Sequence, residues 1–135
     1  MANALYDKGR EGFLDGSIDW DTDTIKAVLV DSADYTRDLT NHDNLDDIPS
    51  GARVATSSAL TSKTVTAGVA DAADVTFSSV TGDQFEYVIL YKDTGVESTS
   101  RLIACIDTAT GLPCTPNGGD ITVQWDSGAN KIFKL

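Results

Sequence analysis

The sequence predicts an all-β protein with one short helix at its N-terminus. Short runs rich in Val, Ile and Thr follow one another, separated by Gly, Asp, Asn and Pro, which is the pattern of strands joined by turns. No stretch shows the strand–helix alternation of a parallel α/β sheet. Only the N-terminal residues have a helical periodicity. These three observations favour two packed antiparallel sheets, a β-sandwich, preceded by a helix.

The expected helix covers residues 3–14, NALYDKGREGFL. Leu5, Gly9 and Phe13 repeat at i, i+4 and i+8, which places them on one helical face. Asn3 is a suitable residue to cap the start. Internal glycines weaken a helix this short, so we expect it to pack against the rest of the protein.

The remainder, residues 18–135, is expected to form the β-sandwich. Its most apolar segment, 85–92 (FEYVILYK), is typical of a central strand, and 25–30 (IKAVLV) is a shorter apolar run of the same kind. The polar segments 31–52 and 107–120 are expected to be long connecting loops. Further strands are expected at 61–67, 74–80, 101–106, 121–125 and 131–135.

Length and charge disfavour several classes of protein. Residues 1–135 fit a single domain. The formal net charge is −11, from 21 acidic and 10 basic residues, so binding to nucleic acid or to an anionic membrane is disfavoured. No apolar run approaches the roughly 20 residues of a membrane-spanning helix. Charges near the N-terminus also differ from a secretory signal, so we expect synthesis in the cytoplasm.

Asp19, Asp21 and Asp23 alternate immediately before an apolar run, and they are weak candidates for a metal site. An EF-hand loop starting at Asp19 needs glycine and glutamate where this chain has Thr24 and Val30. In a strand, the three carboxylates would share one face, where water or a cation must screen their repulsion. We expect a solvated face that leads into the strand, with a structural cation as the alternative.

We expect no catalytic residues and no cofactor. The single histidine, His42, lies in an acidic loop, and no GxSxG turn supplies a serine nucleophile. The glycine-rich segment 117–120 lacks the lysine of a phosphate-binding loop. The sequence therefore predicts a protein without enzymatic activity.

Cys105 and Cys114 match no zinc-binding spacing. A disulfide between them would close a turn-rich loop and stabilise the protein by about 2–3 kcal/mol. A cytoplasmic origin favours free thiols, so the disulfide is the alternative.

Four aromatic residues, Trp20, Tyr87, Tyr91 and Trp125, could stack on sugars if they shared one exposed face. Tryptophan and tyrosine serve more often in cores and interfaces of β-sandwiches. A carbohydrate-binding module is therefore the alternative from another functional class.

Three stretches carry a resemblance to a known class of proteins: MANALYDKGREGFLDGSIDWDTDTIKAVLVD, DIPSGARVATSSALTSKTVTAGVADAADVTF and GDITVQWDSGANKIFKL. Together they resemble the small virion structural proteins of tailed bacteriophages, in particular the capsid decoration (cement) proteins. The resemblance implies a jelly-roll-like sandwich that forms a homotrimer on the capsid surface. It also implies that the partner is the major capsid protein and that binding reinforces the head shell. A tail, neck or fibre component of the virion is the alternative.

Five residues are expected at such an interface. Tyr6, Arg10 and Phe13 belong to the expected helix, and Ile132 and Phe133 lie near the C-terminus. The alternative for Phe13 and Phe133 is a place in the core.

Overall fold

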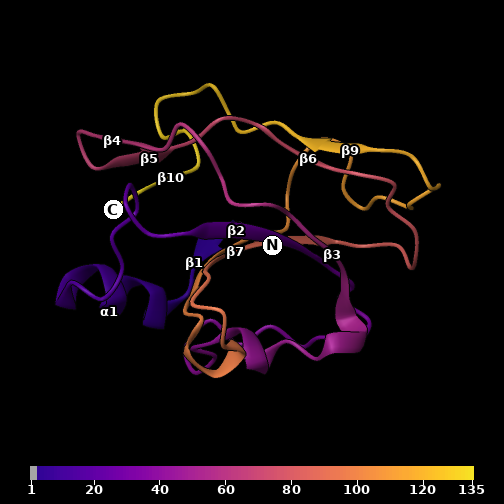
Figure 1. Ribbon diagram of the computed structural model, residues 1–135, viewed down its shortest axis with the longest axis horizontal. Coiled ribbons are helices and arrows are strands. Elements are labelled where there is room, and N and C mark those ends of the chain that lie inside the picture. The colour runs from indigo at the N-terminus through magenta and orange to yellow at the C-terminus, as the bar shows by residue number, and fades with distance from the viewer. Residues whose placement is uncertain (1–2) are drawn as a thin grey trace.

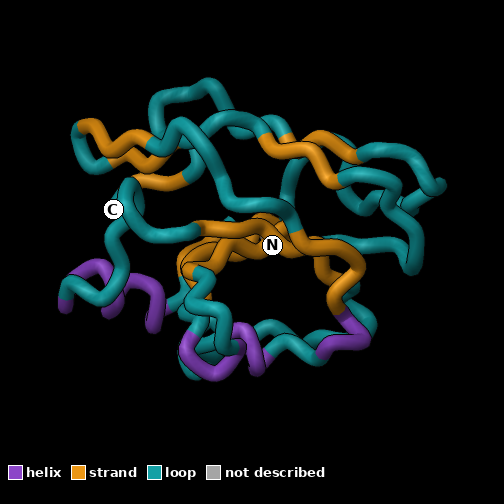
Figure 2. The backbone as a smooth tube through the Cα atoms, viewed as in Figure 1, coloured by secondary structure: helices purple, strands orange, loops and turns teal. Residues whose placement is uncertain are grey.

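The computed structural model describes residues 3–135, which form antiparallel β-sheets and one α-helix (Figures 1 and 2). A five-stranded sheet lies between an upper layer of two small sheets and a lower layer of loops and short helical turns. The elements of the five-stranded sheet are β1 (Ala4–Leu5), β2 (Ile25–Val30), β3 (Arg53–Thr56), β7 (Tyr87–Lys92) and β8 (Leu102–Ile106). The upper layer contains β4 (Thr64–Thr66), β5 (Val69–Asp71), β6 (Val75–Phe77), β9 (Ile121–Val123) and β10 (Phe133–Lys134). The helical elements are α1 (Asp7–Asp15) and the 3-10 turns η1 (Leu45–Asp47), η2 (Ser50–Ala52) and η3 (Glu97–Thr99).

The five-stranded sheet has the order β1-β8-β7-β2-β3, and all its neighbours are antiparallel. Its two central strands, β2 and β7, pair over their full length, from Ile25 opposite Lys92 to Val30 opposite Tyr87. These are the two longest strands of the chain, and the sequence prediction of both is confirmed. Their middle residues, 27–30 of β2 and 88–91 of β7, are all apolar and buried because the sheet is covered on both faces.

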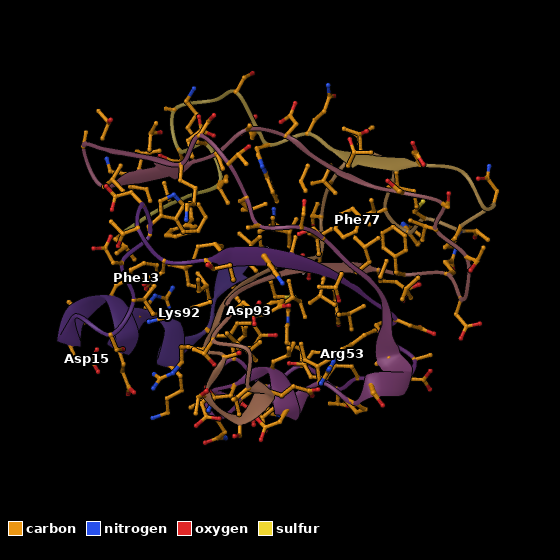
Figure 3. All side chains as sticks on the ribbon, viewed as in Figure 1. Phe13, Asp15, Arg53, Phe77, Lys92 and Asp93 are labelled. Carbon is orange, nitrogen blue, oxygen red and sulfur yellow. The ribbon has the colours of Figure 1, made fainter. Side chains whose placement is uncertain are left out.

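Alternation along the strands divides the core into two clusters. On β2, Leu29 belongs to the cluster between the five-stranded sheet and the upper layer, whereas Val28 and Val30 belong to the lower cluster. Phe77 of β6 points from the upper layer toward the five-stranded sheet (Figure 3). Ile48 is fully buried in the lower cluster.

The upper layer consists of a three-stranded sheet, β10-β5-β4, and a two-stranded sheet, β6-β9. A two-residue turn joins β4 to β5, because Thr66 lies opposite Val69. Both turn residues have a positive φ, 53° at Ala67 and 77° at Gly68, as a type I′ hairpin turn requires.

The segment 31–52 is more than the connecting loop that its polarity predicts. Its apolar residues cover the lower face of the sheet, with Tyr35, Leu45 and Ile48 buried. Arg53 at the start of β3 holds η1 in place, since its guanidinium donates to the carbonyl oxygens of Leu45 and Ile48 (Figure 3). The helical turns η1 and η2 thus form a lid over the lower cluster.

The helix is shorter than expected. It begins at Asp7, because Ala4 and Leu5 pair with β8 as the edge strand β1. Asn3 does not cap the helix: its side-chain Oδ1 accepts the backbone N–H groups of Asp107 and Thr108 at 2.9 Å. The expectation of a helix from residue 3 is therefore wrong for its first turn.

Candidate protein interface

Two of the expected interface residues, Phe13 of α1 and Phe133 of β10, contact each other. Their ring centroids are 5.7 Å apart, and Phe133 meets the ring of Trp20 edge-on at 5.3 Å. The indole Nε1 of Trp20 donates to the carbonyl oxygen of Asp71 at 3.0 Å, which fixes this buried ring. The three rings therefore join α1 to the three-stranded sheet.

A surface hollow of about 380 Å³ lies over this aromatic cluster. Val65 of β4 and Leu135 line it, and they expose 56% and 59% of their surface. Leu14, beside Phe13 on α1, exposes 87%. The fourth large apolar residue with such exposure in the described part of the chain is Val96. Two of the four exposed apolar side chains thus line this hollow, and exposed apolar surface of this kind occurs at protein contact sites.

Asp19 and Asp21 line the same hollow. They lie in a turn, closed by a hydrogen bond from the N–H of Asp23 to the carbonyl oxygen of Asp19 at 2.9 Å. Asp19 and Asp21 are exposed, as expected, but the expected strand-like lead-in is wrong. The hydrogen bond to Asp19 and its negative charge raise the pKa of Asp21, so the two carboxyl groups act on each other.

Asp23 differs from the other two aspartates. It is half-buried, and its carboxylate lies 3.1 Å from the ammonium of Lys92. Lys92 extends from the end of β7 toward the connection between α1 and β2, where it also donates to the carbonyl oxygen of Ser17 (Figure 3). Asp23 is therefore neutralised within the protomer, and the expectation that it faces water is wrong.

The aspartates 19, 21 and 23 do not converge as a set of three metal ligands. In the described residues, three carboxylates converge at two other places. These groups are Asp31, Asp34 and Asp83, and Asp43, Asp46 and Asp47. In the second group the Asp47 carboxylate accepts the backbone N–H of Asp43 at 2.7 Å and that of Asn44 at 3.4 Å, and the bond from Asn44 belongs to the capping box of η1.

The other expected interface residues lie apart from the hollow. Tyr6 is fully buried, so its expected place on the outer surface is wrong. Its hydroxyl is 2.8 Å from that of Tyr35 in the lower cluster, and burial raises its pKa well above the usual range. Arg10 is exposed and pairs with Asp7 at 3.0 Å. Ile132 lines a second opening of the molecule.

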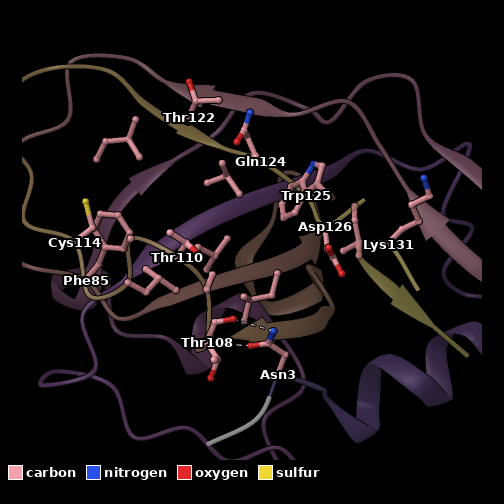
Figure 4. A pocket seen from close by; sticks show the side chains of 18 of the residues that line it. Asn3, Phe85, Thr108, Thr110, Cys114, Thr122, Gln124, Trp125, Asp126 and Lys131 are labelled. Atoms are coloured by element: carbon pink, nitrogen blue, oxygen red, sulfur yellow. Dashed lines mark hydrogen bonds between the residues drawn. The ribbon is translucent and has the colours of Figure 1, made fainter. Parts of the chain in front are cut away.

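This second opening is a cleft of about 740 Å³ between β9, the end of β8 and the loop that follows β8 (Figure 4). Phe85 and Trp125 lie among its apolar lining, and Asn3 is hydrogen-bonded to Thr108 at its edge. The only histidine of the chain is elsewhere, with the Nδ1 of His42 2.8 Å from the hydroxyl of Tyr35. The lining of the cleft therefore holds no nucleophile–histidine pair.

Both cysteines are free, so the alternative of a disulfide is wrong. Cys105 is buried in the lower cluster, whereas Cys114 packs against the upper cluster. The five-stranded sheet separates the two thiols.

The four aromatic residues considered for sugar stacking form no common exposed face. Trp20 and Trp125 are buried in the upper cluster, and Tyr91 is buried in the lower one. Tyr87 packs half-buried against the lower cluster.

Compared with known proteins, the chain matches no family model, and no curated protein matches it significantly. Within residues 3–135, no helix is long and apolar enough to cross a lipid bilayer.

Proposed function

We propose that this chain is a non-enzymatic virion structural protein, specifically a capsid decoration protein that binds the major capsid protein and stabilises the head shell. The observation that carries the proposal is the exposed apolar surface around Phe13 and Phe133. A small β-protein with such a surface is suited to docking onto a larger assembly. The resemblance of the sequence to phage virion proteins indicates that this larger assembly is a virion.

The strand pairing supports a jelly-roll-like topology. In the last six strands, β5 pairs with β10, β6 with β9 and β7 with β8. These pairs are nested around the β7–β8 connection, and they pass from the upper layer into the five-stranded sheet. A long antiparallel ribbon that rolls over two layers is the basis of a jelly roll.

We further propose a homotrimer on the capsid surface. A closed ring of three copies buries matching surfaces around a threefold axis. Exposed residues such as Arg10 then remain for contact between copies, and the acidic surface that faces water keeps the assembly soluble.

The proposal is tested on particles purified without this chain. Adding the protein back is expected to raise the temperature at which the shells release DNA. The double variant Val65→Ser with Leu135→Ser is expected to restore less of this stability, because it removes exposed apolar contact area. Val96→Ser, which alters an exposed apolar residue elsewhere, is the matched control.

Shells that gain no stability from the wild-type protein would contradict a decoration role. Imaging of labelled protein distinguishes a decoration protein, which covers the shell, from a tail, neck or fibre component, which occupies one vertex.

A further inference from the structure

The hollow over the aromatic cluster combines apolar walls with charge of one sign. Val65, Phe133 and Leu135 contribute apolar surface. Among its described lining residues, the ionisable side chains are those of Asp19 and Asp21, so the lining contains no lysine or arginine. A ligand that fits this surface has an apolar part and a positive charge.

Within the protomer, these two charges are only partly compensated, since the hydrogen bond to Asp19 raises the pKa of Asp21 and the more distant charge of Lys63 offsets this only in part. In the described residues, no basic side chain forms an ion pair with Asp19 or Asp21 within 4.0 Å, whereas Lys92 pairs with the neighbouring Asp23. The carboxylates of Asp19 and Asp21 repel each other, and a cation placed between them relieves that repulsion.

A second copy of the chain is poorly equipped to supply this cation. Seven of its ten basic side chains already form ion pairs within the described part of the protomer. Two more, Lys63 and Arg101, donate to backbone carbonyl oxygens. The occupant is therefore a different polypeptide.

We propose that the hollow binds a partner segment in which a bulky apolar side chain stands beside a lysine or arginine. The apolar side chain packs between Val65, Phe133 and Leu135, and the cation pairs with Asp19 and Asp21. The inference rests on the proposed function, in which the partner is the major capsid protein.

Three synthetic peptides test this chemistry in solution, independently of any virus particle. They are GSKLFKSG, its acidic counterpart GSELFESG and its polar counterpart GSKSSKSG. Nuclear magnetic resonance of the full-length protein reports binding through the indole N–H of Trp20 and the backbone amide of Val65. We expect saturable shifts of these signals with GSKLFKSG alone, and weaker binding as the salt concentration rises.

Variants complete the test. Asp19→Asn with Asp21→Asn is expected to weaken binding about fivefold, the size of exposed charge pairs. Asp34→Asn with Asp46→Asn removes two charges elsewhere and is expected to leave binding unchanged. Three results would each overturn the inference. The first is equal binding of the basic and acidic peptides, and the second is no chemical-shift change with any peptide at millimolar concentration. The third is a shift of the Trp20 and Val65 signals when only the protein concentration is raised. Absence of the chain from virions would instead overturn the proposed function, while leaving the peptide result intact.

Discussion

At the scale of single residues, a buried ion pair ties the lower layer to the five-stranded sheet. The guanidinium of Arg37 lies 3.3 Å from the carboxylate of Asp107, and the two side chains expose only 3% and 8% of their surface. Arg37 also lies over the ring of Tyr87, 5.4 Å from its centroid. The pair thus connects the segment 31–52 to the end of β8.

Asp107→Asn is expected to lower the free energy of unfolding by about 3 kcal/mol, because it removes the negative charge that faces the buried Arg37 guanidinium. Denaturant unfolding measures the loss. Glu11→Gln is the control, since it breaks the exposed pair with Lys8 and is expected to cost well under about 1 kcal/mol. Equal effects of the two substitutions would show that the Arg37–Asp107 pair contributes no more than a surface pair.

Burial raises the pKa of the Cys105 thiol to about 11, which leads to a pH dependence of stability. The unfolded chain releases this proton near its ordinary value of 9.0, while the folded protein keeps it. The folded state therefore binds more protons between these values, and stability falls as pH rises from about 9 to 11. Unfolding measured across this range is expected to show a shallower fall in Cys105→Ala. Because burial also raises the pKa of Tyr6 and Tyr35, some fall remains in the variant.

Among the candidate site residues, those whose exposure depends on their own side-chain chemistry were predictable from the sequence. The exposure of Asp19 and Asp21 follows from their charge. The contact between Phe13 and Phe133 was not predictable, because it joins the two ends of the chain through the fold. Tyr6 was misplaced because its burial depends on the pairing of β1 with β8, about a hundred residues away in the sequence. Val65 and Leu135 were not predicted as interface residues. Val65 is an apolar residue within the polar run TSKTVTAG, which is a pattern that indicates an exposed apolar position.

At the scale of elements, the docking of α1 on β8 depends on the absence of a side chain at Gly9. A Cβ atom there would lie 2.7 Å from the carbonyl oxygen of Leu102 and 2.9 Å from the Cα of Ile103. These are backbone atoms of β8, which cannot move aside as a side-chain end can. The glycine lets the helix lie directly on the strand.

Gly9→Ala is therefore expected to destabilise the protein by about 2–3 kcal/mol, although alanine favours a helix over glycine. Thermal unfolding tests this sign. Gly51→Ala, where no atom lies within 4 Å of the added Cβ, is the matched control and is expected to be nearly neutral. A stabilised Gly9→Ala protein would contradict the close packing of α1 on β8.

The long apolar strands were predictable from the sequence, and so were short strands whose residues are rich in Val, Ile, Thr or Phe, such as β4, β6, β9 and β10. β2 and β7 carry enough apolar residues to stand out, and their place at the centre of the sheet follows from burial on both faces. β1, β3 and β5 were not predictable, because their sequences, AL, RVAT and VAD, carry little apolar or alternating pattern. Their conformation is set by the strands beside them.

At the scale of the whole molecule, charge and apolar surface are distributed unequally. The hollow gathers exposed apolar side chains, while the net charge of −11 keeps the rest of the surface hydrated. This division suits a small protein that docks by one region and faces water elsewhere. Composition alone indicated the charge, but only the folded chain brings Phe13, Val65 and Leu135 together.

The most direct test of the proposed role is quantitative mass spectrometry of purified virions, which gives the copy number of this chain relative to the major capsid protein. A decoration protein that covers the shell is expected at a copy number comparable to that of the major capsid protein. A few copies per particle would place the chain at the neck or tail, and its absence from the particle would contradict a virion role altogether.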